Sequence, residues 1–397
     1  MNPNLDKLQP YPFEKLNKLK AEAQVTSDLP HIALSIGEPK HDSPQFVLDA
    51  MANNLDKLAN YPSTKGLPEF RQAMADWACQ RFHLSGLNPE TQILPVNGTR
   101  EAIFAFTQAV IDPSQEDALV VSPNPFYQIY EGASYLAGVE PHYLPCLEEN
   151  GFNPDFDAVP AEIWARTQVL FTCSPGNPTG AVIQFETLKK LIELADKYDF
   201  ILASDECYSE IYVDGTDAPI GLLEACAKLG RDDFKRCVVF HSLSKRSNLP
   251  GLRSGFIAGD ADILGPFFNY RTYHGCAMSI PNQLASIAAW KDETHVEENR
   301  RLYTEKFKAV LDILSPVMDV KQSDASFYLW AKTPINEEVF AQRLYAEQQV
   351  TVLPGSYLSR TVDGVNPGAN RVRMALVAEV DECIEAAKRI RALIESL

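Results

Sequence analysis

Between about residue 42 and residue 278, short apolar runs typical of buried strands alternate with longer runs of helical periodicity. The strand candidates are residues 118–122, 168–172, 200–204, 237–241 and 255–258, and the helix candidates include 69–82, 99–110 and 186–198. Strands that alternate with helices form a mainly parallel sheet covered by helices. We therefore predict an α/β fold whose functional groups gather at the carboxyl ends of the strands.

The chain has 397 residues, a length that favours two domains. An arm and a short helix are predicted between residues 5 and 20, and residues 282–314 form one long helical pattern that would link the domains. The strand-like run 326–330 and the helical run 379–397 predict a smaller α+β domain. The expected organisation is residues 1–41 as an arm and part of the small domain, 42–281 as the large domain, and 282–397 as the connecting helix and the small domain.

Lys245 stands among groups that suit a particular cofactor. It follows an apolar, strand-like run that ends near His241, with Ser242 and Ser244 beside it and Arg253 a few residues later. An amine can form a Schiff base with an aldehyde. Hydroxyls and a guanidinium can hold a phosphate, to which arginine makes a bidentate contact. This set points to pyridoxal 5′-phosphate (PLP), which carries both groups.

Taken alone, the segment around Lys245 has two other interpretations. A lysine after Ser-x-Ser also occurs on solvent-exposed surfaces, and some β-lactam enzymes use Ser-x-x-Lys with the serine as nucleophile. Features elsewhere in the chain therefore have to decide between them.

Two upstream segments supply what a pyridine ring needs. Asp205 ends an apolar run, where a carboxylate facing the ring nitrogen would keep that nitrogen protonated. Tyr208, three residues later, and Asn177, in the loop 174–180, could hydrogen-bond the ring's phenolate oxygen. Considered separately, Asp205 would also suit a helix N-cap and the loop would suit an ordinary turn.

A third segment, Asn97-Gly98-Thr99, opens the helical run 99–110. A glycine turn at a helix N-terminus binds anions through backbone N–H groups and the helix dipole. Gly98 and Thr99 are thus candidates for binding the phosphate, although short glycine turns before helices are common.

Together these segments resemble the aspartate-aminotransferase-like family, class I and II, of fold-type I PLP enzymes, over nearly the whole chain. The resemblance implies a seven-stranded, mainly parallel sheet in the large domain. It implies a catalytic role for Lys245, Asp205 and Tyr208. It implies cofactor contacts from Gly98, Thr99, Tyr127, Asn177, Ser242, Ser244 and Arg253, with Tyr127 stacked on the ring. It also places Gly37 near the substrate and Arg373 on its α-carboxylate. Tyr61 would reach the phosphate of a neighbouring subunit, which implies a homodimer with shared active sites.

Segments 97–102, 243–256, 295–300 and 354–373 are similar to the N-succinyldiaminopimelate aminotransferases of bacterial lysine synthesis. This resemblance implies transfer of the amino group of N-succinyl-LL-2,6-diaminopimelate to 2-oxoglutarate. The alternatives are an aspartate, alanine or aromatic aminotransferase, or a PLP lyase on the same scaffold. A PLP-binding regulator would need a DNA-binding module, and the chain has no spare basic segment for one.

The net charge of −17 argues against nucleic acid and anionic membranes as partners. The eight cysteines form no CxxC pair, so we expect a reducing cytoplasm, no disulfides and no zinc or other metal. No apolar run approaches the ~18 residues of a membrane span, and the N-terminal residues lack the layout of a signal peptide.

Because PLP and an acylated diamino diacid are anions, their site must be a local cationic region of this acidic protein. Arg253 and Arg373 supply two cations, and the further candidates are Lys40, Lys65, Arg100, Arg246 and Arg271. Arg100 is favoured as a substrate ligand because a cation at a helix N-terminus opposes the helix dipole and needs an anion nearby. That anion could be Glu101 or a substrate carboxylate, and each of the other cations could equally be a solvated charge.

Overall fold

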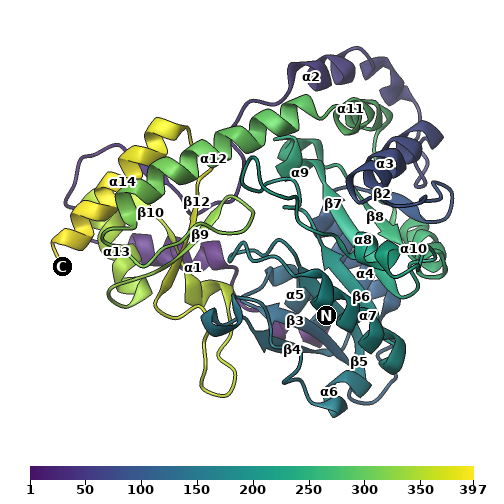
Figure 1. The fold of residues 1–397 in the computed structure, drawn as a ribbon, viewed down its shortest axis with the longest axis horizontal. Helices are drawn as coiled ribbons and strands as arrows, with labels where there is room; N and C mark the ends of the chain where they lie inside the picture. The colour runs from purple at the N-terminus through teal and green to yellow at the C-terminus, as the bar shows by residue number, and fades with distance from the viewer.

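A computed structural model describes all residues from 1 to 397, and its centre is a seven-stranded sheet (Figure 1). The strand order is β2-β8-β7-β6-β5-β3-β4. These strands are β2 (Ile93–Val96), β3 (Leu119–Asn124), β4 (Glu140–Pro145), β5 (Thr167–Cys173), β6 (Ile201–Asp205), β7 (Cys237–Ser242) and β8 (Gly255–Gly259). The pairs among β3 to β7 are parallel, and β8 runs antiparallel to both of its neighbours. The predicted α/β fold with a mainly parallel sheet is confirmed.

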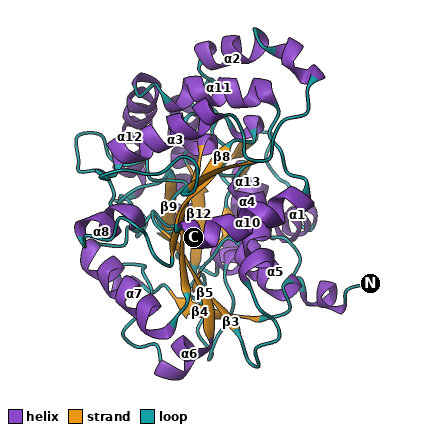
Figure 2. Ribbon diagram, turned by 90° about the vertical axis from the view of Figure 1, so that its right-hand side faces the viewer, coloured by secondary structure: helices purple, strands orange, loops and turns teal.

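Helices cover both faces of this sheet (Figure 2). Alternate residues of each strand enter different cores: in β7, Val239 joins the helices α3 (Pro68–Arg81), α7 (Phe185–Tyr198) and α8 (Leu222–Lys228). Its neighbour Val238 joins α4 (Thr99–Val110), α5 (Gln128–Leu136) and α10 (Ala261–His274) on the opposite face. A strand buried on both faces needs a continuous apolar run, which is why the central strands are visible in the sequence.

Strands β2 and β4 are absent from the strands predicted by pattern. β2 has only four residues and contains Pro95, and β4 is an edge strand that begins and ends in exposed residues and also contains prolines. Proline lacks a backbone donor and is confined to edge strands and strand ends, so these segments do not read as strands.

A second core lies in the half of the molecule that holds the C-terminal helix α14 (Val380–Glu395). It gathers Leu16 and Ile32 from the N-terminal region with residues of the segment 307–393. Its strands are β1 (Ile32–Ala33) paired with β10 (Val350–Thr351), and the antiparallel β11 (Leu353–Pro354), β12 (Arg371–Ala375) and β9 (Tyr328–Lys332). This core supports the division at residues 41 and 281, which remains a proposal.

The remaining helices complete the two halves. They are α1 (Pro12–Ala21), α2 (Gln45–Ala52), α6 (Ala161–Arg166), α9 (Leu243–Arg246), α11 (Ile280–Trp290), α12 (Thr294–Leu314), α13 (Glu337–Gln348) and α14 (Val380–Glu395), with short 3₁₀ turns at Pro3–Lys7, Leu55–Ala59, Glu148–Asn150, Pro250–Leu252 and Gly355–Leu358. No helix combines the length and the apolar character needed to cross a bilayer.

The segment 282–314 is not one helix, as its pattern predicts, but belongs to two, α11 and α12. Asp292 lies between them and accepts a hydrogen bond from the backbone N–H of His295 (3.1 Å). Arg246 donates to the backbone carbonyls of Ala289 (2.9 Å) and Asp292 (3.2 Å). The break therefore depends on a contact with a distant side chain, which helical periodicity cannot reveal.

Candidate active site

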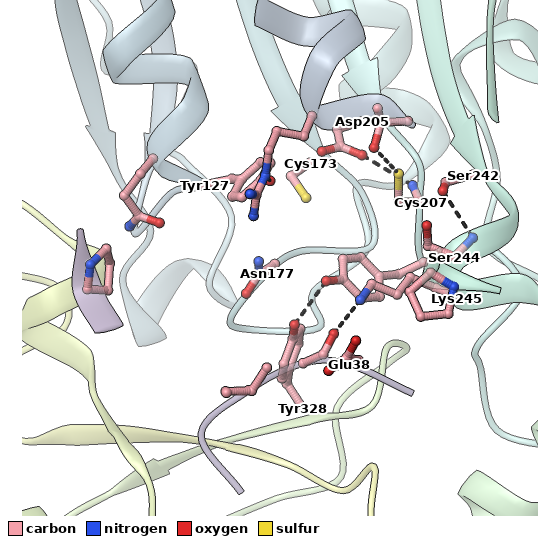
Figure 3. A pocket seen from close by; sticks show the side chains of 18 of the residues that line it. Glu38, Tyr127, Cys173, Asn177, Asp205, Cys207, Ser242, Ser244, Lys245 and Tyr328 are labelled. Carbon is pink, nitrogen blue, oxygen red and sulfur yellow. Dashed lines mark hydrogen bonds between the residues drawn. The ribbon is translucent and has the colours of Figure 1, made fainter. Parts of the chain in front are cut away.

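A cavity of about 560 Å³ lies at the carboxyl ends of the central strands (Figure 3). It brings together most of the residues predicted from the sequence: Gly37, Thr99, Arg100, Tyr127, Asn177, Asp205, Tyr208, Ser242, Ser244, Lys245, Arg253 and Arg373. The N-terminal segment also contributes, through Tyr11 and Phe13. The residues predicted at the strand ends therefore gather in one cavity.

The predicted phosphate site is the corner of the cavity where the Gly98 turn, before α4, meets Arg253. Gly98 has a φ of +85°, and a Cβ at this position would lie 2.1 Å from an Nη atom of Arg253. Only glycine lets the turn approach the guanidinium this closely. Arg253 donates to the carbonyl oxygens of Pro250 (2.8 Å) and Asn97 (3.4 Å), which holds it in place. A guanidinium beside a helix N-terminus is an anion site.

Two serines complete this corner, Ser242 at the end of β7 and Ser244 in α9. The Ser242 hydroxyl accepts from the backbone N–H of Ser244 (3.1 Å) and caps α9. Both side chains line the cavity. Their hydroxyls can therefore donate to an anion bound between α4 and α9.

Asp205 ends β6 as a buried carboxylate. Its oxygens accept from the hydroxyl of Tyr130 (2.9 Å) and the backbone N–H of Cys207 (3.3 Å). Burial raises the pKa of Asp205, and these hydrogen bonds only partly oppose the shift. No helix begins after Asp205, so the helix N-cap reading of this residue is wrong. Its carboxylate faces the cavity and suits a protonated ring nitrogen.

Lys245 projects into the cavity from α9, a helix of four residues. Its ammonium donates to the carbonyl oxygen of Gly37 and lies 5.4 Å from the ring centroid of Phe327. Burial lowers the pKa of Lys245 to about 8. A large fraction of this amine is therefore neutral near pH 8, and the neutral amine is the nucleophile.

We expect the cofactor-free protein to capture an aldehyde cofactor faster as pH rises through about 8. Because the nucleophile is the deprotonated amine, the neutral fraction and the rate constant should rise about tenfold between pH 7 and pH 9. Stopped-flow absorbance after mixing with PLP measures this. A midpoint near 10.5, the value of an ordinary lysine, would contradict the effect of burial.

Arg373, the predicted ligand of the substrate α-carboxylate, lines the cavity and is buried. It donates to the side-chain oxygen of Asn177 (2.9 Å) and to the carbonyl of Ser35 (2.7 Å), and it lies over the ring of Tyr328. Its Nε has no partner. A buried guanidinium with a free donor suits a carboxylate ligand.

Some residues of the site were not predicted. Tyr130 positions Asp205, and the hydroxyl of Tyr328 lies 2.9 Å from that of Tyr208. Tyr130 belongs to the helix α5 and Tyr328 to the strand β9, and each has the pattern of an ordinary core residue, so no local signal marks them. The Cys207 thiol, 3.1 Å from the Thr99 hydroxyl, joins the phosphate turn to the Asp205 segment.

Tyr61 does not line the cavity of its own chain, and its side chain is fully exposed. Its predicted place at the phosphate of a neighbouring subunit stays a prediction.

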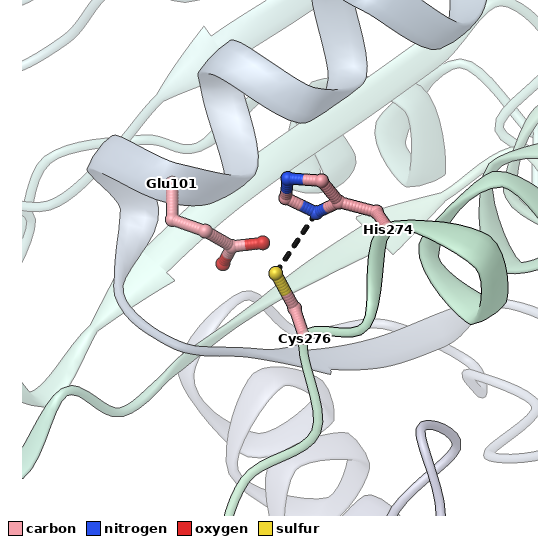
Figure 4. Close-up of side chains that lie close together, drawn as sticks. All are labelled: Glu101, His274 and Cys276. Atoms are coloured by element: carbon pink, nitrogen blue, oxygen red, sulfur yellow. Dashed lines mark hydrogen bonds between the residues drawn. The ribbon is translucent and has the colours of Figure 1, made fainter.

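Glu101, His274 and Cys276 lie together beside the phosphate turn (Figure 4), and their potential ligand atoms all lie within 4.8 Å of one another. The Glu101 carboxylate already pairs with the buried guanidinium of Arg271 and accepts from the backbone N–H of Asn97 (3.1 Å). The Cys276 thiol lies 2.9 Å from Nδ1 of His274. These contacts brace the start of α4, and we assign the cluster that role.

Comparison with known proteins now identifies the family. Residues 30–390 match the model of aminotransferase class I and II. The chain belongs to this family. An aminotransferase structure from Neisseria meningitidis is 50% identical, with a TM-score of 0.95 over 99% of this chain and all of that one. A probable N-succinyldiaminopimelate aminotransferase from Thermus thermophilus is 27% identical, with a TM-score of 0.84 over 96% and 99% of the two chains. An LL-diaminopimelate aminotransferase from Maridesulfovibrio salexigens is 34% identical over 97% of each chain.

Enzymes of this family use PLP, and the cavity fits that cofactor. The close approach of Gly98 to Arg253 makes an anion cradle. Asp205 offers a buried carboxylate for the ring nitrogen, and Lys245 offers an amine of lowered pKa for the aldehyde. The protein is a PLP-dependent aminotransferase.

Proposed function

We propose that the enzyme transfers the amino group of N-succinyl-LL-2,6-diaminopimelate to 2-oxoglutarate. The observation that carries this proposal is an unpaired cation, Arg100, in the cavity. Arg253 and Arg373 are expected to bind the cofactor phosphate and the substrate α-carboxylate. A diacid substrate needs a further cation for its distal end.

Arg100 has no acidic partner. It donates to the hydroxyls of Tyr127 (2.7 Å) and Tyr11 (3.4 Å) and forms no salt bridge, because the neighbouring Glu101 pairs with Arg271 instead. Glu101 is therefore not the anion that offsets Arg100. A substrate carboxylate is the remaining candidate, and the helix N-terminus would add to its binding.

A second candidate substrate is unacylated LL-diaminopimelate. Several relatives at 31–34% identity are LL-diaminopimelate aminotransferases. Glu38 lines the same cavity and would suit the second ammonium group of that compound. The succinylated substrate lacks this ammonium and carries an additional carboxylate on its acyl group, so the two candidates differ in the charge at the distal end.

Each residue of the site has its own role in transamination. PLP supplies a ring that accepts the electron pair released at the substrate Cα. Arg373 orients the α-carboxylate, and Asp205 would hold the proton on the ring nitrogen. Lys245, freed when the substrate amine binds, takes the Cα proton and later returns a proton, as general base and acid.

We further propose that the enzyme is a cytoplasmic homodimer in which Tyr61 of each subunit completes the neighbouring site. The exposed aromatic ring of Tyr61 supports this, because an isolated chain would leave it in water.

The test is an assay of 2-oxoglutarate release from glutamate with N-succinyl-2-amino-6-oxopimelate, run on the wild type and Arg100→Leu. Loss of a charge-assisted contact is expected to raise the KM for the succinylated compound about 10- to 100-fold. The KM for alanine, which has no distal carboxylate and whose turnover is followed by pyruvate release, should be unaffected by the substitution.

The reverse reaction, in which each amino donor is supplied with 2-oxoglutarate and glutamate formation is followed, separates the alternatives. Faster turnover of LL-diaminopimelate than of its succinylated form would favour the second candidate. Fast turnover of aspartate or alanine, with no response to either compound, would discard both and keep the family chemistry.

A further inference from the structure

A chain of hydrogen bonds connects the small-domain core to the backbone of the catalytic lysine. The Lys306 ammonium donates to Nε2 of His41 (2.6 Å) and to the carbonyl of Val377 (3.4 Å). Nδ1 of His41 lies 2.7 Å from the side-chain oxygen of Asn299. The Asn299 amide in turn donates to the carbonyl oxygen of Lys245 (3.3 Å).

The chemistry of the groups sets the direction of every bond. Lysine has only donors, so Nε2 of His41 must accept. The neutral imidazole then carries its proton on Nδ1 and donates it to the Asn299 oxygen. That leaves the Asn299 amide group to donate, and the carbonyl of Lys245 can only accept. All three side chains are thus held in one arrangement, with no free choice of tautomer or amide orientation.

Burying the polar groups of this hydrogen-bond chain costs free energy. Lys306 and Asn299 are each 2% exposed, and Lys306 forms no salt bridge. Burial lowers the pKa of Lys306. Burial and then the charge of Lys306 lower the pKa of His41, whereas the hydrogen bond to Asn299 and the charges of Glu379 and Glu298 raise it. A buried ammonium without a carboxylate adds little stability, so a role beyond packing is indicated.

The two ends of this hydrogen-bond chain lie beside the segments that carry Lys245 and Arg373, the two residues that must be aligned. Asn299 holds the carbonyl of Lys245, the residue that moves the proton. Lys306 contacts Val377, two residues beyond β12, the strand that carries Arg373. Asn299 and Lys306 both belong to α12, which packs on α14 of the small domain. None of the three side chains lines the cavity, so they act on the site through others.

We propose that His41, Asn299 and Lys306 form a positioning relay that holds the backbone of Lys245 in register with the strand of Arg373. The relay keeps the lysine amine over the Cα of a substrate whose carboxylate Arg373 has bound. This concerns the transamination common to the family, so any amino donor that the enzyme accepts can test it, whatever the outcome for the succinylated substrate.

The test compares Asn299→Asp with the wild type under saturating donor. The carboxylate has nearly the same shape as the amide but cannot donate to Lys245. We expect kcat to fall about 10- to 100-fold, the cost of a displacement of about 1 Å at a reacting group, with little change in KM. His41→Asn keeps a donor near the position of Nδ1 and should retain most of the activity, whereas His41→Ala should resemble Asn299→Asp.

A double-mutant cycle and a matched control complete the design. His41→Ala combined with Asn299→Asp should cost little more than either change alone, because both break one relay. The control is His31→Asn, which removes an exposed histidine bonded to the Thr351 hydroxyl (2.7 Å) and unconnected to Lys245. Additive losses, an equal loss in His31→Asn, or an unchanged kcat in Asn299→Asp would overturn the proposal.

Discussion

Replacement of Lys245 by alanine is expected to lower turnover by at least about 10⁴-fold. Proton transfer by a positioned acid–base group contributes about 10²–10⁴-fold, and this residue also forms the covalent link to the cofactor aldehyde. No other lysine lines the cavity. Steady-state transamination between glutamate and an oxo acid measures the loss. Lys245→Arg should not rescue it, since a guanidinium stays protonated at every working pH.

Lys40→Ala is the control for this change, because Lys40 is exposed and does not line the cavity. Its turnover should equal that of the wild type. Acid–base transfer by a side chain contributes at least about 10²-fold to the rate. If Lys245→Ala retained more than about a hundredth of the wild-type activity, another group would have to move the proton.

The sequence predicted for a physical reason that the residues at the strand ends would come together in one cavity. In β5, β6 and β7 the buried apolar runs end just before Asn177, Asp205 and Lys245. Parallel strands end at the same edge of a sheet, so polar residues that follow them must meet there. Gly98 was predictable in the same way, because a glycine turn before a helix marks both a backbone constraint and an anion site.

What the sequence could not predict depends on contacts between distant segments. Tyr328 belongs to a strand of the small domain, yet its hydroxyl meets Tyr208 of the large one. Arg246 appeared only as a candidate cation, and its side chain in fact lies buried at the junction of α11 and α12, where it pairs with Glu293. Neither pattern nor spacing carries information on such pairings, because each requires the complete fold.

Conversion of Asp205 to asparagine is expected to lower turnover by about 10²–10⁴-fold. The cause is the loss of a buried charge opposite the ring nitrogen, and breaking a buried ion pair costs about 3–5 kcal/mol. Asparagine has the same shape and still accepts from the Tyr130 hydroxyl, so the fold and cofactor position should change little. The measurement is kcat for both half-reactions.

Tyr130→Phe separates the charge of Asp205 from its positioning. This variant removes the 2.9 Å hydrogen bond and leaves the carboxylate ionisable. A single hydrogen bond contributes about 0.5–1.5 kcal/mol, which corresponds to a loss of only about two- to tenfold. Asp205→Asn must therefore be much slower than Tyr130→Phe if the charge matters most. Equal losses would show instead that Asp205 acts through the geometry that Tyr130 sets, and that the ring nitrogen does not depend on its charge.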